Sequence, residues 1–159
     1  MNHRLSRVRD YLREHNLEGV IVSKPENRRY LSGFTGSAGM LLIGAEEARL
    51  ITDFRYTEQA SQQAPNYTIV KHAPDIYDTL AAEIKSLGWS KVGFESDFVN
   101  YDSYKRIVEI TVEPVPVQLD GLRMIKDESE LASIRKAVEV ADSAFKDILP
   151  LLKPGARER

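Results

Sequence analysis

The spacing of apolar residues alternates along the chain between a helical period and short continuous runs. Four apolar residues near the start share one helical face, which predicts an amphipathic helix over residues 2–16. That face consists of Leu5, Val8, Tyr11 and Leu12. The run Val20–Val22 is too short for a helix, and its β-branched side chains favour a buried strand. A helix followed by a strand therefore opens the chain.

The same alternation continues to the far end. We predict helices over residues 27–31, 54–63, 76–87, 101–110 and 128–148, and strands over residues 40–43, 48–52, 68–71, 92–94 and 112–117. The turn Gly44–Glu47 joins two of these strands into an antiparallel hairpin. Pro114 and Pro116 lack the N–H groups that a central strand needs, so the last strand must lie at a sheet edge. The predicted fold class is therefore α/β, with a mixed β-sheet flanked by helices.

Two helix starts in the first half carry capping signals. Ser23 and Glu26 have the spacing of a capping box at the start of the short second helix. Thr52 and Asp53 offer cap oxygens to the helix predicted over residues 54–63.

The last predicted helix carries an apolar seam along its length. Asp127 and Glu130 have capping-box spacing at its start. Its apolar residues recur at steps of three and four, at Leu131, Ile134, Val138, Ala141, Phe145 and Ile148. The seam could cover the sheet of the same domain or meet a further domain. We expect the natural chain to continue beyond this helix, so we divide it into an N-terminal α/β domain over residues 1–122 and a second part over residues 123–159, which consists of a long connecting helix and the stub of a further domain.

Composition argues against several classes of partner. The net charge is −2, and the 22 Lys and Arg residues are scattered, which gives no basis for binding nucleic acid or a membrane surface. No apolar run approaches the roughly 18 residues of a membrane span, and the start lacks the apolar core of a signal peptide. The chain has no cysteine, which excludes disulfides and thiolate metal sites and is typical of a reducing compartment. We therefore expect a cytoplasmic protein.

The stretch Asn27–Gly39, which reads NRRYLSGFTGSAG, is the leading candidate for a functional segment. Its second half is rich in glycine and hydroxyl residues that bury little apolar area, so we expect a presented loop. The candidate residues of this loop are Phe34, Thr35, Gly36, Ser37 and Ala38, and we expect the loop to present backbone donors and one aromatic side chain, that of Phe34. Asp53, Arg55 and Tyr56, directly after the predicted hairpin, are further candidates. Both segments also have a plain structural interpretation, as a connection and as the capped first turn of a helix.

Other side chains that often carry chemistry give weaker signals. The three histidines, His3, His15 and His72, are far apart and lack metal-ligand spacing, so we expect none to bind a metal or act as a base. Glu95 and Asp97 follow a predicted strand, where functional carboxylates often lie, but a solvated strand end explains them more simply. The glycines of the loop follow a helix and not a strand, which is the wrong context for phosphate binding.

Four segments carry the strongest family signal when they are taken together and in order. They read NRRYLSGFTGSAG at Asn27–Gly39, ITDFRYTEQA at Ile51–Ala60, LRMIKDESELASIRKA at Leu122–Ala137 and LKPGARE at Leu152–Glu158. This combination resembles the N-terminal part of Xaa-Pro peptidases, the group of aminopeptidase P, prolidase and creatinase. The resemblance covers essentially the whole chain. It departs in the last segment, where the family has Thr after Pro-Gly-x and this chain has Arg157.

The resemblance implies the N-terminal, non-catalytic domain of a metal-dependent hydrolase that cleaves the bond before proline. Two divalent metal ions, manganese or cobalt, would then bind in a separate pita-bread catalytic domain, and none in this one. The implied partners are that C-terminal catalytic domain, a second subunit of a homodimer, and proline-containing peptides. The eight candidate residues would line the partner subunit's active site, where Arg55 could meet a substrate carboxylate.

Two alternatives stay open. The chain could be the matching domain of a creatinase-like amidinohydrolase. It could also be a non-enzymatic module that binds peptides or proteins, because the fold also resembles modules of histone chaperones.

Overall fold

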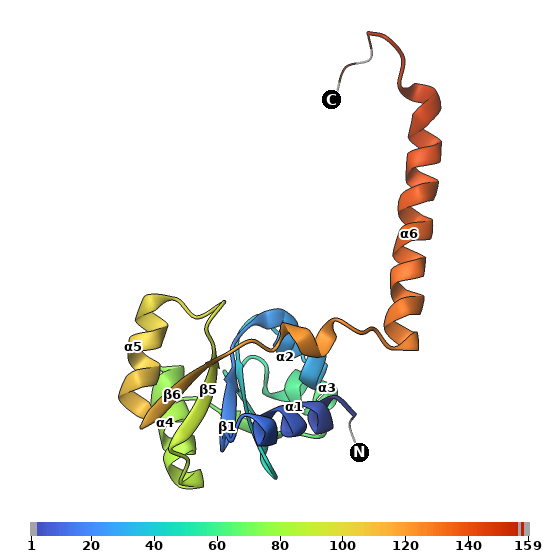
Figure 1. Cartoon of the computed structure of the whole chain (residues 1–159). Helices are drawn as coiled ribbons and strands as arrows, with labels where there is room; N and C mark the ends of the chain where they lie inside the picture. The colour runs from blue at the N-terminus through green and yellow to red at the C-terminus, as the bar shows by residue number, and fades with distance from the viewer. Residues whose placement is uncertain (1–2, 156, 158–159) are drawn as a thin grey trace. The chain divides into compact units, whose positions relative to one another are not determined.

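In the computed structural model the chain forms two compact units, the first ending at Arg123 and the second beginning at Met124. A six-stranded sheet organises the first unit. The structure describes residues 3–155 and 157 (Figure 1). The strands are β1 (Gly19–Val22), β2 (Met40–Gly44), β3 (Ala48–Thr52), β4 (Thr68–Lys71), β5 (Lys91–Glu95) and β6 (Glu113–Val117). Their order is β4-β3-β2-β1-β5-β6, and only β2 runs antiparallel to its neighbours. The predicted mixed sheet and its hairpin are confirmed.

Helices cover both faces of this sheet. They are α1 (His3–Glu14), α2 (Pro25–Ser32), α3 (Thr57–Gln63), α4 (Ile76–Leu87) and α5 (Tyr101–Ile110), followed by the 3-10 turn η1 (Asp120–Arg123). Successive strand residues point to opposite faces, so Val20 and Val22 pack in the cluster with α1 and α2, and Ile21 packs with α4 and α5. The predicted α/β layer architecture is therefore confirmed.

Two of the predicted helix starts are wrong. The N-cap of α2 is Lys24, which makes no side-chain capping bond, so Ser23 and Glu26 form no capping box. Helix α3 begins only at Thr57, with Tyr56 as its N-cap, so Asp53 lies outside the helix. Ser23 N instead donates to Glu95, 72 residues away, and Asp53 instead accepts from Arg55, two residues further along the chain.

The edge strand β6 exposes few hydrogen-bond donors. Glu113 N donates to the Ser90 carbonyl (2.9 Å), and the Val117 carbonyl accepts from Ser96 N (3.4 Å), so alternate residues of β6 face β5. Pro114 and Pro116 lie between them and face outward. Neither has an N–H, which protects the open edge from pairing with another strand.

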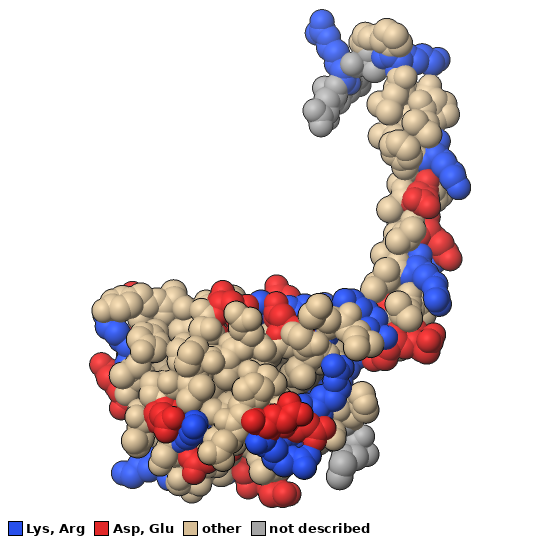
Figure 2. Space-filling model, in the orientation of Figure 1, with Lys and Arg blue, Asp and Glu red and all other residues tan. Residues whose placement is uncertain are grey.

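The surface of the first unit carries both signs of charge. On the face shown in Figure 2, small groups of basic and acidic residues are separated by uncharged surface, and neither sign forms a broad patch. The scattered charges of the sequence therefore stay scattered on this face.

The second unit consists of α6 (Glu128–Ile148) and the 3-10 turn η2 (Leu149–Leu151). The predicted capping box is confirmed, because Glu130 N donates to Asp127 Oδ1 and Asp127 N donates to Glu130 Oε2, both at 2.9 Å. No residue of α6 is buried, and its own unit offers no sheet to cover the apolar seam. Across the described residues, no helix joins the length and apolar character that a bilayer crossing needs.

Candidate functional site

The candidate residues lie along the sheet edge where five parallel strands end. Residues 23–27, 53–56 and 96–100 follow β1, β3 and β5 at this edge, and the loop of residues 33–39 joins them because it precedes the reversed strand β2. From β1 the chain moves outward through β2, β3 and β4, and it then returns to the other side of β1 as β5. Open α/β sheets bind ligands where the strand order reverses in this way.

The ring of Phe34 lies beneath the loop and not on its surface. Phe34 is only 1% exposed, and its ring meets that of Tyr56 edge-on, with centroids 5.9 Å apart. A Cβ atom at Gly36 would lie 2.2 Å from Phe34 Cζ, so only glycine lets the backbone cross the ring this closely. The expectation that Phe34 presents an aromatic face is therefore wrong. In the neighbouring segment after β3, Phe54 is 70% exposed.

Hydrogen bonds fix the outer part of the loop. Thr35 donates through its N–H and its hydroxyl to Gln63 Oε1 (2.9 and 3.1 Å), which ties the loop to α3. The hydroxyls of Ser37 and Tyr56 share a hydrogen bond of 2.8 Å. Thr52 Oγ1 donates to the Ala38 carbonyl (2.7 Å). The structure thus brings the candidate residues of the loop together with those that follow β3.

Asp53 and Arg55 form a preorganised ion pair at the same edge. Asp53 accepts from Arg55 N (2.9 Å), Nε (3.0 Å) and Nη2 (2.7 Å). The side-chain hydrogen bond from Arg55 lowers the pKa of Asp53, and the same bond raises the pKa of Arg55. The Asp53 side chain is 12% exposed and that of Arg55 is 61% exposed. Asp53 therefore orients a guanidinium group that remains open to solvent.

The free side of this guanidinium can accept a second anion. A guanidinium has five N–H donors, and Asp53 occupies those of Nε and one of Nη2. Nη1 of Arg55 meets no acceptor within the described residues. A carboxylate approaching from solvent could bind this side in the bidentate geometry that arginine favours.

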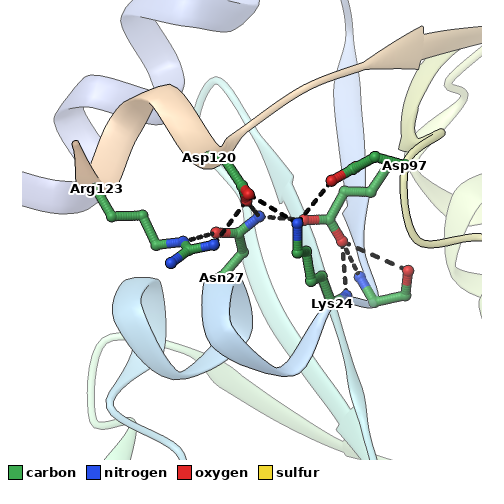
Figure 3. Close-up of polar contacts among 7 residues, drawn as sticks. Lys24, Asn27, Asp97, Asp120 and Arg123 are labelled. Atoms are coloured by element: carbon green, nitrogen blue, oxygen red, sulfur yellow. Dashed lines mark hydrogen bonds and ion pairs between the residues drawn. The ribbon is translucent and has the colours of Figure 1, made fainter.

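The carboxylate of Glu95 is buried in a polar network, so its interpretation as a solvated strand end is wrong. Glu95 is 0% exposed. Its Oε2 accepts from the backbone N–H groups of Ser23 and Lys24, and its Oε1 accepts from Asn27 Nδ2, each at 2.7 Å (Figure 3). Burial raises the pKa of Glu95, and the hydrogen bond from Lys24 N is the largest of the contacts that oppose this. Glu95 thereby anchors the first turn of α2 to β5.

The network continues from α2 to the segment that follows β6. Lys24 Nζ donates to Asp97 (2.6 Å) and to Asp120 (2.8 Å), and Arg123 Nη2 donates to Asp120 (2.8 Å). The hydrogen bond from Lys24 is the largest influence that lowers the pKa of Asp120, to about 2. Figure 3 shows the Asn27 side chain below Asp120, between Arg123 and Lys24. The pair Glu95 and Asp97, which follows a predicted strand, was the sequence signal for this network. Lys24 gave no signal because its partners lie 73 and 96 residues away.

Two open grooves run along the loop. One, of about 410 Å³, lies between the start of α2 at Pro25 and Glu26 and the residues 34–37. The other, of about 710 Å³, is lined by residues 38–40, by Tyr77 and by residues that follow β1, β4 and β5. The loop is therefore a ridge between two hollows, with Ser37 and Arg28 lining both.

The histidines and carboxylates of this domain do not form a metal site. His15 stacks on Tyr11 and contacts its carbonyl oxygen, and the ring of His72 contacts the carbonyl of Ala73. Among residues 3–155 and 157, no three His, Asp or Glu side chains are grouped so that they could hold a metal ion.

Comparison with known proteins gives concordant matches. The profile of the creatinase/prolidase N-terminal domain matches residues 4–125. An uncharacterized peptidase, YqhT of Bacillus subtilis, is 35% identical over 98% of this chain and 45% of its own length. A Xaa-Pro dipeptidase from Bacillus anthracis superposes with a TM-score of 0.93 at 41% identity, over 98% of this chain and 44% of its own.

One matching structure is itself an isolated domain. The N-terminal domain of the cytoplasmic peptidase PepQ from Mycobacterium tuberculosis matches with a TM-score of 0.71 at 33% identity, over 77% of this chain and all of its own. The chain spans less than half the length of the first two relatives, and other matching proteins are named Xaa-Pro dipeptidase or probable Xaa-Pro aminopeptidase P.

Proposed function

Because this chain belongs to the creatinase/prolidase N-terminal domain family, we propose that it is the non-catalytic N-terminal domain of a Xaa-Pro peptidase. The single observation that supports this best is the agreement with the Bacillus anthracis Xaa-Pro dipeptidase over 98% of this chain and only 44% of the relative. The catalytic part then corresponds to the unmatched remainder. The domain boundary falls near residue 122, and α6 (Glu128–Ile148) connects the two parts.

In this proposal the domain acts as a wall of a substrate site. The protein is a homodimer in the cytoplasm, and the loop of residues 34–38, with Asp53, Arg55 and Tyr56, encloses the active site of the partner subunit. The exposed, preoriented guanidinium of Arg55 binds the C-terminal carboxylate of a short peptide. Phe54 supplies the exposed aromatic surface beside it, in the place that the sequence assigned to Phe34.

Two divalent metal ions, manganese or cobalt, belong to the catalytic part of this proposal. The described residues do not fit such a pair, since no group of metal-ligating side chains occurs among them. No step of the reaction is therefore assigned to this domain, and we expect the 159-residue chain alone to leave Xaa-Pro peptides uncleaved with or without added manganese. Metal-dependent cleavage by the purified chain would contradict this division of labour.

The test is to measure kcat/KM of the longer protein on Xaa-Pro dipeptides and tripeptides after Arg55→Ala and Phe54→Ala. A charge-assisted hydrogen bond is worth roughly 1.5–3 kcal/mol, so Arg55→Ala should lower kcat/KM by about 10- to 100-fold, most strongly for dipeptides. Arg13→Ala is the matched control, because Arg13 is also an exposed arginine paired with a nearby aspartate, Asp10. Its kinetics should equal those of the wild type.

The same assay separates the alternatives. Wild-type kinetics of Arg55→Ala and Phe54→Ala on every peptide length would reduce this edge to a structural connection. Hydrolysis of creatine in place of peptides would favour the amidinohydrolase. Peptide binding without turnover would favour a binding module.

A further inference from the structure

Arg28, on α2, is a buried cation beneath the loop of residues 36–39. It is only 4% exposed. Its Nη1 donates to the Gly39 carbonyl (2.6 Å) and its Nη2 to the Gly36 carbonyl (2.7 Å). Its Nε–H meets no acceptor in the described part of the chain, and its partners are neutral carbonyls and not a carboxylate. Within the described residues, the guanidinium therefore donates hydrogen bonds only to the loop.

This placement is a poor one for stability. Desolvation lowers the pKa of Arg28, and the negative charges of Glu26 and Glu95 only partly oppose it. Arg28 also lies in the first half of α2, near the helix end where the macrodipole disfavours a cation. An apolar side chain of similar length often stabilises a protein as well as such a buried charge does. The geometry of the loop gives a better reason for an arginine here.

The guanidinium fixes two carbonyls that lie three residues apart. Its planar fork can donate to the Gly36 and Gly39 carbonyls together, whereas a lysine ammonium is a single point of charge. Thr52 Oγ1 likewise donates a hydrogen bond to the Ala38 carbonyl. Side chains beneath the loop therefore hold three of its carbonyls, while in the described residues the backbone N–H groups of residues 36–38 meet no acceptor.

We propose that Arg28 is a positioning residue that holds residues 36–39 so that the N–H groups of residues 36–38 bind an oxygen of the peptide substrate. Successive backbone N–H groups of this kind form a concave site for carboxylate or carbonyl oxygen. The proposal rests on the proposed function, because that function supplies the peptide. It adds a second contact beside Arg55, and it requires the loop to be rigid before the substrate arrives.

The first arm of the test measures loop order in the 159-residue chain. Backbone ¹⁵N order parameters at Gly36, Ser37 and Gly39 should be near 0.85 in the wild type and fall below about 0.6 in Arg28→Met, while β1 and β2 keep their values. Arg28→Lys should restore only part of the order. Arg29→Met is the matched control, because Arg29 lies on the same helix, is exposed, and donates no side-chain hydrogen bond within the described residues.

The second arm measures kinetics in the longer protein. Losing one substrate hydrogen bond corresponds to roughly a tenfold change, so Arg28→Met should raise KM for Xaa-Pro peptides about tenfold and leave kcat within about twofold. Arg29→Met should change neither. Arg28→Gln, which keeps one donor group, replaces Arg28→Met if the apolar variant does not fold.

The outcomes distinguish this inference from the proposed function. An ordered loop in Arg28→Met would overturn the positioning role. Suppose that Arg28→Met has a disordered loop and the KM of the wild type, while Arg55→Ala has a lowered kcat/KM. This result would overturn the substrate contact of residues 36–38 and leave the proposed function standing. Wild-type kinetics in both Arg28→Met and Arg55→Ala would overturn both this inference and the proposed function.

Discussion

The closest packing in the site can be tested with a double-mutant cycle of Phe34→Leu and Gly36→Ala. A Cβ at Gly36 would lie 2.2 Å from Phe34 Cζ, whereas ordinary contact begins at 3.4 Å, so the ring would have to retreat by about 1 Å. Overpacking of this kind costs typically about 1–3 kcal/mol. Phe34→Leu removes the edge-on contact with Tyr56 and should cost about 1–3 kcal/mol as well.

The two changes should not add. Leucine vacates the far end of the ring, where the new methyl group would sit, so the double variant should be about 1–2 kcal/mol more stable than the sum predicts. The matched control is Gly121→Ala, because a Cβ there would meet no atom within 4 Å. That variant should stay within about 0.5 kcal/mol of the wild type.

The measurement is urea unfolding of the chain, monitored by circular dichroism and by the fluorescence of Trp89, the single tryptophan of the sequence. Unchanged m values would justify comparing free energies of unfolding between variants. If the effects of Phe34→Leu and Gly36→Ala add within about 0.3 kcal/mol, the ring does not lie beneath Gly36. The buried position of Phe34 would then be wrong, and with it the choice of Phe54 as the presented aromatic.

Three further predictions concern the frame around the site. The contact with Lys24 lowers the pKa of Asp120 to about 2, so its stabilisation should be present above the unfolded value near pH 4 and be lost as the pH falls toward 2. The difference in unfolding free energy between the wild type and Asp120→Asn, under about 1 kcal/mol because the side chain is 46% exposed, should disappear over that range. Asn100→Ala removes the side chain that accepts from Ser103 N at the start of α5 and should cost about 1 kcal/mol in thermal unfolding. Replacing Pro114 and Pro116 together by valine should restore outward N–H groups on β6 and cause concentration-dependent association in light scattering, and a monomeric variant would contradict the role of these prolines.

Periodicity was sufficient to predict the layers of this fold. The run Val20–Val22 and the two strands of the hairpin, β2 and β3, are short apolar runs that favour buried strands. The strands and the mixed sheet could therefore be predicted from the sequence. The prolines of β6 also fixed its place, because only an edge tolerates them. What periodicity could not supply was the start of α2, because the donors near Ser23 are used by Glu95, 72 residues away.

The sequence did not distinguish the buried side chains of the candidate site from the exposed ones. Phe34 and Phe54 are both aromatic residues in irregular segments, and no period distinguishes the buried ring from the exposed one. The difference arises from neighbours: Gly36 leaves space for the ring of Phe34, and no comparable cover lies over Phe54. The sequence also predicted Asp53 as a helix cap. Its actual partner, Arg55, lies only two residues away, so sequence distance did not distinguish the ion pair from a cap.

The adjacent residues Arg28 and Arg29 show where sequence reasoning about this site ends. They are chemically identical and share one helix, yet one is buried and bonded to two loop carbonyls while the other is exposed. Helical spacing places Arg28 on the face of the buried residues Leu31 and Ser32, whereas Arg29 lies in the last turn, where the macrodipole favours a cation. The spacing does not show why the buried position holds a cation; the carbonyls of Gly36 and Gly39, which accept from the guanidinium, do. A residue that looks like a solvated charge in the sequence therefore becomes the support on which the shape of the proposed substrate wall depends.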